Sequence, residues 1–323
     1  MSDYEEARKR WIADRPAFQE FGREVERRLA DAVKRRGVWA HVSGRAKEVD
    51  SLVKKLITKS KYNYDTLGDK AGARIILKYK DEIGNALDAA RMVLELGEVE
   101  HKVETMPPDQ MGYLSTHVDV RLYKDDPLTK KFPPAVFFAE LQVRTQAQHL
   151  WAEMSHDSIY KNDETISPLP NDLKRRVFNL AGAIELADNE FTRLRDDMPK
   201  TPECDLLRAL ERHYYKFTAR RWDPEVSKHI IGFLLPLYGA EVSSIEARLD
   251  EFCAQHSTTL AHVYDEAATD STDQSAFLHQ PEALMIYNLL ELDRASTREV
   301  WDEHFPDKEL ERLALKFGIS FEN

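Results

Sequence analysis

The stretch VFFAELQVRTQAQHLWAEMSH, residues 136–156, decides the fold. Its first ten residues alternate between apolar and polar side chains, which is the period of a strand with two different faces. Glu140, Gln142 and Arg144 are expected on one face, opposite the apolar residues between them. The residues that follow have helix composition and place His149 on a stripe of polar side chains. A charged strand face that runs into a polar helix stripe indicates a cleft for a charged ligand.

Further strands and helices are predicted on the N-terminal side of this stretch. THVDVRLY (116–123) alternates with period two, and ARIILKY (73–79) reads as a buried strand. The pattern predicts a helix over 82–96 and a second strand over 99–106. Residues 4–35 repeat apolar side chains at helical spacing and predict one or two amphipathic helices.

Residues 46–60 (AKEVDSLVKKLITKS) have helix composition, and Ser43 is a candidate cap for that helix. Helical spacing then places Lys47, Ser51 and Lys54 near one face. Strands interleaved with helices through residue 161 predict an α+β domain, a mixed sheet flanked by helices.

The second half of the chain shows no convincing strand after residue 168 and predicts an all-helical region. The helices are expected over residues 172–194, 204–217, 224–239, 242–255, 283–293 and 308–318. We therefore expect two domains: residues 1–165 with the sheet, and residues 166–323 as an acidic helical accessory or regulatory domain.

Charge divides the chain at the same place. Residues 1–165 hold 28 basic and 28 acidic side chains, whereas residues 166–323 hold 18 basic and 29 acidic ones. Within the first half, residues 34–80 carry 13 basic side chains against four acidic ones. Such a local excess is typical of a surface that binds a polyanion, either a nucleotide polyphosphate or a nucleic acid.

Composition excludes several classes of protein. With 323 residues, 42% hydrophobic and 32% charged, the chain reads as globular rather than disordered or fibrous. The longest nearly apolar stretch, residues 230–240, is too short to span a bilayer, and the first thirty residues lack an export signal. The only cysteines, Cys204 and Cys253, are then expected as reduced thiols in a cytoplasmic protein.

Five motifs in order resemble the RelA/SpoT-type alarmone synthetase domain. They are GRAKEVDSLVKKL (44–56), GDKAGARII (68–76), GYLSTH (112–117), ELQVRT (140–145) and WAEMSH (151–156). The resemblance covers about the first half of the chain and leaves the helical second half unassigned. It implies a nucleotidyltransferase-like fold and a small synthetase that transfers pyrophosphate from ATP to the 3′-hydroxyl of GDP or GTP, making (p)ppGpp and releasing AMP.

The resemblance also implies roles for individual residues. Arg45 and Arg74 would hold the adenine of ATP, and Lys47 and Lys55, with Lys54 and Ser51, would bind the triphosphate. Asp69 and Glu140 would hold Mg²⁺ and serve as the catalytic carboxylates, with Glu140 accepting the proton of the attacking hydroxyl. Convergence of these two carboxylates, beside Tyr113, is the central expectation.

The motifs specify the acceptor nucleotide less closely than they specify ATP. The resemblance places Tyr113 against the acceptor base, and His117, Gln142 and Arg144 on its ribose and phosphates. His149 stands where guanine-specific relatives commonly carry Asn, so adenine nucleotides, giving (p)ppApp, stay open as acceptors. So does the 3′ end of tRNA, which toxic relatives modify. No separate hydrolase domain is visible, so we expect synthesis without hydrolysis.

Three interpretations of the whole stay open from the sequence. The leading one is an ATP-dependent pyrophosphokinase, and the second is a nucleotide-sensing regulatory protein that binds without turnover. A tRNA-modifying toxin is the third. For the acidic second half, regulation of the cleft, oligomerisation and a plain helical scaffold are the alternatives, and direct binding of RNA is disfavoured because a surplus of Lys and Arg is missing.

Overall fold

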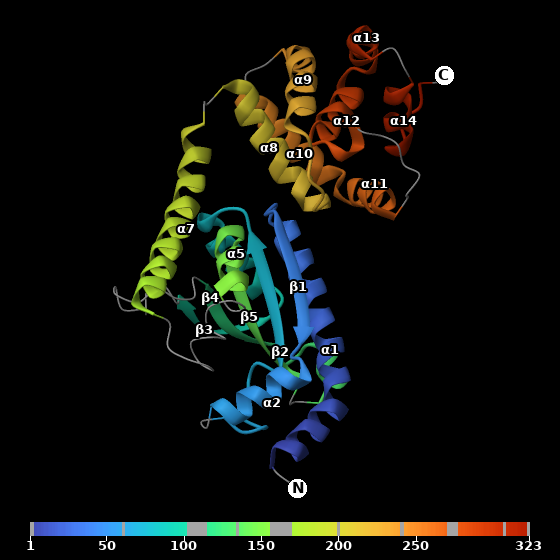
Figure 1. Ribbon diagram of the computed structural model, residues 1–323. Coiled ribbons are helices and arrows are strands. Elements are labelled where there is room, and N and C mark those ends of the chain that lie inside the picture. The colour runs from blue at the N-terminus through green and yellow to red at the C-terminus, as the bar shows by residue number, and fades with distance from the viewer. Residues whose placement is uncertain are drawn as a thin grey trace. The chain divides into compact units, whose positions relative to one another are not determined.

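A computed structural model describes most of the chain (Figure 1). The described residues are 3–59, 62–101, 115–133, 136–155, 170–198, 201–239, 242–269, 277–305 and 308–321. The chain forms two compact units, one of residues 1–33 and 39–197 and one of residues 34–38 and 198–323. The first unit holds the sheet, and the second is helical throughout its described part.

The sheet of the first unit has five strands in the order β1-β2-β5-β4-β3. Strands β2 and β5 pair in parallel, while the other three pairs are antiparallel, so the sheet is mixed as expected. The strands are β1 (Ala40–Ala46), β2 (Ala71–Leu77), β3 (Glu95–His101), β4 (Thr116–Arg121) and β5 (Phe138–Thr145).

One face of the sheet is the apolar core of the first unit. The side chains that alternate toward it, such as Ile75, Leu141 and Val118, are almost completely buried. Helix α1 (Asp3–Arg35) covers part of this face with a fully buried apolar stripe that includes Trp11. Helix α3 (Ile83–Arg91) packs on β3 and β5.

Gly44 explains how closely α1 approaches β1. A Cβ atom at Gly44 would lie 2.1 Å from the carbonyl oxygen of Gly22 in α1. The Gly44 amide also donates to the Glu26 carboxylate at 2.9 Å. Only a residue without a side chain permits this contact between helix and strand.

Two N-terminal boundaries differ from the sequence prediction. Ser43 lies inside β1 and caps no helix, because β1 extends to Ala46 and α2 (Val49–Thr58) begins only at Val49. Lys47 therefore precedes the helix and does not share its face. The predicted helix over 82–96 ends at Arg91, and β3 takes up residues 95–101, because Glu95 and Leu96 pair with β4. The remainder of the predicted strand over 99–106 lies outside the described residues.

The helices that follow β5 agree closely with the pattern. Helix α5 (Gln146–Ser155) follows β5 directly, and α7 (Asn171–Asp197) packs against α5 within the first unit. The second unit contains α8 (Pro202–Phe217), α9 (Pro224–Leu234), α10 (Val242–Gln255), α12 (Glu282–Leu292) and α14 (Glu309–Lys316), all near the predicted ranges.

Two helices of the second unit were not predicted from the sequence. They are α11 (Ser257–Thr269) and α13 (Arg294–His304), each of which has Ser and Thr residues of weaker helix propensity near its start. Packing supports them: Leu260 of α11 and Trp301 of α13 are fully buried. Among the described residues, no helix combines the length and the apolar character needed to cross a membrane.

Candidate active site

The face of the sheet opposite α1 carries polar side chains in rows. Strand register places Arg45 opposite Gly72, Gly72 opposite Glu140, and Glu140 opposite Asp119. A second row, two residues along each strand, runs Ser43, Arg74, Gln142, His117. Gly72 leaves the middle of the first row without a side chain. A hollow forms there, lined by Ser43, Arg45, Lys47, Asp69, Gly72, Ala73, Arg74, Glu140 and Gln142.

Asp69 stands at one side of this hollow, just before β2. Its Oδ2 accepts hydrogen bonds from Lys47 Nζ at 2.6 Å and from Lys55 Nζ at 2.7 Å. The Lys47 amide also donates to the Lys70 carbonyl at 2.8 Å, which fixes the end of β1 beside the Asp69 turn. Because both lysine ammonium groups bind Oδ2, the Oδ1 atom of Asp69 is available to a further ligand.

Glu140 stands on the floor of the hollow in a string of hydrogen bonds. His117 Nδ1 lies 3.2 Å from Glu140 Oε1, and Gln142 Nε2 donates to Oε2 at 2.9 Å. Arg144, which is fully buried, donates to Gln142 Oε1 at 2.5 Å. Burial alone would raise the pKa of Glu140, but His117, Gln142 and the charge of Lys55 outweigh it and lower that pKa to about 2. The carboxylate is thus ionised at neutral pH.

The far end of the polar face is closed by α5. Glu153 accepts from Arg74 Nη1 at 3.3 Å, and His149 Nδ1 lies 3.8 Å from the same carboxylate oxygen. Burial, together with the positive charges of Arg144 and Arg74, lowers the pKa of His149. A neutral imidazole at this position has one donor and one acceptor nitrogen, which suits reading the edge of a base.

Most of the residues selected from the sequence therefore occupy one face. Arg45, Lys47, Asp69, Arg74, Glu140 and Gln142 line the hollow itself, and Lys55, His117 and Arg144 adjoin it through hydrogen bonds. Ser51 and Lys54 lie on the exposed side of α2 and do not line the hollow. Tyr113, selected for stacking, lies outside the described residues.

The donor set of the hollow fits a small hard cation. Asp69 Oδ1 is buried and has no hydrogen-bond partner among the described residues, and the ionised Glu140 lines the same hollow. No cluster of three metal-binding side chains occurs within the described ranges. Mg²⁺ characteristically uses only one or two carboxylates and completes its shell with water and phosphate oxygens, so two carboxylates suffice.

Asp119 is a further member of this face, to which the sequence reasoning assigned no function. It sits directly across from Glu140 on β4. Burial raises the pKa of Asp119, and the negative charges of Glu140, Glu100 and Asp69 raise it further. The available signal was the alternation of β4 itself, which places Asp119 on the same face as His117.

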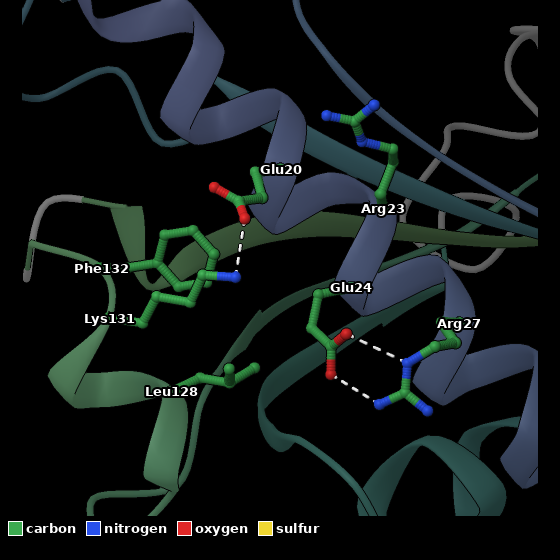
Figure 2. A pocket seen from close by; sticks show the side chains of 7 residues that line it. All are labelled: Glu20, Arg23, Glu24, Arg27, Leu128, Lys131 and Phe132. Carbon is green, nitrogen blue, oxygen red and sulfur yellow. Dashed lines mark hydrogen bonds and ion pairs between the residues drawn. The ribbon is translucent and has the colours of Figure 1, made fainter.

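A second hollow of the first unit has a different character (Figure 2). It lies between α1 and the short helix η2 (Pro127–Lys130) and contains none of the residues selected from the sequence. Four of its five charged side chains pair with one another: Lys131 binds Glu20 at 2.7 Å, and Arg27 Nη2 binds Glu24 at 2.7 Å. The hollow beside Asp69, with a carboxylate oxygen left over, is therefore the better candidate site.

Residues 44–165 match the family model of the region found in RelA / SpoT proteins. All described residues of the candidate site except Ser43 lie inside this range. Residues 44–165 thus form a region of the kind found in RelA / SpoT proteins, and the helical C-terminal region extends beyond it.

Two curated relatives are similar in sequence to part of this chain. GTP pyrophosphokinase YwaC of Bacillus subtilis is 29% identical over 140 residues, which is 42% of this chain and 65% of the relative. GTP pyrophosphokinase YjbM of the same organism is 28% identical over 159 residues, 49% of this chain and 72% of the relative. The chain is therefore a distant homologue of GTP pyrophosphokinases, and the match covers less than two thirds of YwaC.

Solved structures give similar coverage. The small alarmone synthetase 1 of Bacillus subtilis, crystallised with its product pppGpp, is 22% identical with a TM-score of 0.48, and the match covers 59% of this chain and all of that one. A GTP pyrophosphokinase family protein from Streptococcus pneumoniae is also 22% identical, with a TM-score of 0.49, covering 58% of this chain and 94% of the other.

Proposed function

We propose that the chain is an ATP-dependent pyrophosphokinase that acts on the 3′-hydroxyl of a purine nucleotide. The observation that carries the proposal is that Asp69 and Glu140, 71 residues apart in the sequence, line one hollow together with Lys47, Arg45 and Arg74. Two carboxylates and several fixed cations around one cavity suit a polyphosphate with a bound Mg²⁺. Guanine nucleotides are the proposed acceptors, since the relatives are GTP pyrophosphokinases.

In this proposal the hydroxyl oxygen attacks the β-phosphorus of ATP. The bond between that phosphorus and the oxygen of the α-phosphate breaks, and AMP leaves with both electrons of the bond. Arg45 and Arg74 bind the adenine, and Lys47 and Lys55 offset the negative charge of the phosphates. A bound Mg²⁺, held by Asp69 and Glu140, would supply charge neutralisation at the phosphate oxygens.

The low pKa of Glu140 refines its role. A carboxylate with a pKa of about 2 retains a proton only briefly at neutral pH. General bases work best when their pKa lies near the working pH. Glu140 is therefore proposed first as a metal ligand and hydrogen-bond acceptor for the hydroxyl, whose proton it passes on to water, while His117, 3.2 Å away, holds the carboxylate in place.

The acceptor base is the finer point of the proposal. Arg74 donates a hydrogen bond to Glu153, which lies beside His149. The neutral imidazole of His149 can form a hydrogen bond with the edge of guanine or of adenine. Adenine nucleotides are therefore a competing acceptor in this proposal, and the 3′ end of tRNA is a further one. We also propose that the protein acts in the cytoplasm.

The test is direct. Purified protein is incubated with Mg·ATP and, separately, with GDP, GTP, ADP and tRNA, and the nucleotide products and released AMP are resolved by chromatography. Release of AMP with a pyrophosphorylated acceptor is expected, and Glu140→Gln is expected to remove it. If the wild-type protein binds ATP yet releases no AMP with any acceptor, the proposal is wrong and a non-catalytic nucleotide sensor is favoured.

A further inference from the structure

Lys47, which lines the hollow, lies in a short link between two elements and belongs to neither. Strand β1 ends at Ala46 and helix α2 begins at Val49, so residues 47 and 48 form the β1–α2 link. The ammonium group of a lysine is carried on a long flexible stem. A lysine that must meet a phosphate at a fixed place therefore needs a backbone that other groups hold.

Helix α1 supplies two hydrogen-bond donors to the carbonyl oxygen of Lys47. Trp11 Nε1 donates to this oxygen at 3.2 Å, and Arg15 Nε donates to it at 3.1 Å. Because Trp11 and Arg15 follow one another at i,i+4 spacing, they lie on the same side of α1. A carbonyl oxygen has two lone pairs, and the two donors occupy both. They thereby fix the direction of the peptide bond that follows Lys47.

Further contacts hold the rest of the β1–α2 link. Arg15 Nη2 donates to Glu48 Oε1 at 2.5 Å, so Arg15 binds both residues of the link. The Lys47 amide donates to the Lys70 carbonyl at 2.8 Å. The backbone of Lys47 is thus held by α1 on its carbonyl side and by the turn before β2 on its amide side. From this fixed backbone, Lys47 Nζ reaches Asp69 Oδ2 at 2.6 Å.

The turn that carries Asp69 also contacts α1. Lys70, the next residue, is buried, and its ammonium nitrogen lies 4.2 Å from the centroid of the Tyr64 ring and 5.8 Å from that of the Phe18 ring. Phe18 belongs to α1 and contacts Trp11, with 5.1 Å between the ring centroids. Helix α1 therefore contacts the chain on both sides of the ion pair between Lys47 and Asp69.

Arg15 and Trp11 do not belong to the hollow itself. Neither occurs among the described residues that line it. Trp11 is fully buried, and the donors of Arg15 are directed at the Lys47 carbonyl and at Glu48. An effect of Arg15 on a bound nucleotide must therefore pass through Lys47. In this respect Arg15 differs from Arg45, which lines the hollow directly.

We propose that Arg15 is a positioning residue for the triphosphate of ATP, that it acts through the backbone of Lys47, and that Trp11 is its partner donor. The inference rests on the proposed function, and it extends the machinery of that function to α1, which lies outside the matched range 44–165. With the carbonyl held, the ammonium group of Lys47 stays beside Asp69 and the phosphates. Without the donor from Arg15 the β1–α2 link can turn, and Lys47 loses this place.

The first experiment compares two substitutions of similar length at Arg15. Arg15→Gln places an amide nitrogen where arginine has Nε and can still donate to the Lys47 carbonyl, whereas Arg15→Met has no donor. Isothermal titration calorimetry of the full chain with Mg²⁺ and AMPCPP, an ATP analogue with a methylene bridge between the α- and β-phosphorus atoms, measures the affinity. It should fall about tenfold with Arg15→Met and less than about threefold with Arg15→Gln.

The matched control is Arg8→Met, which removes another arginine of α1 that forms an ion pair with α2, to Asp50 at 3.5 Å. This exposed pair should matter little, so the affinity for AMPCPP should change less than about twofold. Equal affinities of Arg15→Met and Arg15→Gln, or an equal loss with Arg8→Met, overturn the proposal.

The second experiment tests whether Arg15 acts through Lys47, in a double-mutant cycle. If it does, Arg15→Met should lower the affinity for AMPCPP less than about twofold once Lys47→Met is present. A general structural role would give the same tenfold loss in both backgrounds, and that result overturns the proposal. Circular dichroism and thermal melts of each variant check that the fold is retained.

The measurement of AMP release separates this inference from the proposed function. In the active enzyme Arg15→Met should raise the KM for ATP about tenfold and leave the KM for the acceptor unchanged. If AMPCPP binds and the cycle shows coupling but no AMP is released, the pyrophosphokinase proposal fails and the positioning role of Arg15 stands. If AMP is released and the cycle shows no coupling, the positioning role alone fails. A wild-type protein that does not bind AMPCPP overturns both.

Discussion

Two glutamates, one half-buried in the first unit and one fully buried in the second, differ in their hydrogen-bond partners and in their pKa. Glu140 of β5 has hydrogen-bond partners in His117 and Gln142 and a pKa lowered to about 2. Glu282, at the start of α12, is completely inaccessible, and burial raises its pKa to about 7 against the weaker effect of the Ser227 hydroxyl. The first unit keeps its carboxylate charged beside a hollow, whereas burial in the core of the second unit shifts its carboxyl toward the protonated form. Burial alone therefore does not identify a site: the partners that preserve charge do.

The largest effect is expected from Glu140→Gln. The change removes the charge that the surrounding groups stabilise, and AMP release with Mg·ATP and GDP should fall about 1,000-fold, or about 4 kcal/mol in transition-state free energy. Glu98→Gln, on the exposed part of β3, is the control and should retain full activity. Comparable activity in the two variants would remove Glu140 from the site.

Glu282→Gln should act on stability and its pH dependence instead. Because the folded pKa lies near 7, above the ordinary value of 4.5, the native state retains its proton to higher pH than the unfolded chain. The protonated Glu282 thus adds about 3 kcal/mol to the free energy of unfolding. This contribution is fully present below about pH 4.5 and is lost as the pH rises through 7.

Thermal melts of wild type and Glu282→Gln between pH 5 and pH 8 check this expectation. The Tm of the variant should rise relative to that of the wild type as the pH rises. The proposed pyrophosphokinase activity per folded molecule should not change. Glu299→Gln, at an exposed position of α13, is the control, and its difference in Tm from the wild type should not depend on pH. A constant difference for Glu282→Gln as well would contradict the comparison of the two glutamates.

Gly44→Ala tests the packed face of the sheet. The new methyl group would lie 2.1 Å from the Gly22 carbonyl oxygen, so helix and strand must separate. A destabilisation of about 2 kcal/mol and a fall in Tm of about 4–8 °C are expected for the first unit. Gly84→Ala, where a Cβ meets nothing within 4 Å, serves as the control and should leave Tm unchanged or slightly higher.

Gly72→Val tests the polar face of the same sheet and carries the smallest expected effect. A Cβ there would meet only the Glu140 carbonyl oxygen, at an ordinary 3.7 Å, so Tm should not change. The side chain enters the hollow, and the KM for ATP should rise about tenfold, or about 1.4 kcal/mol. Gly72→Ala should give a smaller rise. A loss of Tm with unchanged KM would mean that Gly72 serves packing and not the hollow.

Much of the fold was predictable because its signals are local. Period-two alternation located β4 and β5, and helical spacing located α1, α5, α7 and most helices of the second unit. The boundaries that failed were those set by pairing. Strand β1 was missed because Ser43 read as the cap of a helix, and β3 begins earlier than its pattern because Glu95 and Leu96 pair with β4. Helices α11 and α13 were missed because tertiary packing, and not propensity, stabilises them.

The sequence by itself determined which side chains share a strand face, since alternation is a property of consecutive residues. Glu140, Gln142 and Arg144 could be grouped on that basis, and the motif order selected Asp69 and the lysines. Only the tertiary structure decided that Asp69 and Glu140 line one hollow, because this depends on the parallel pairing of β2 with β5, which joins residues about seventy positions apart. It also decided that Glu140 stays charged whereas Glu282 does so only in part, since the pKa of each depends on neighbours that the local sequence does not specify.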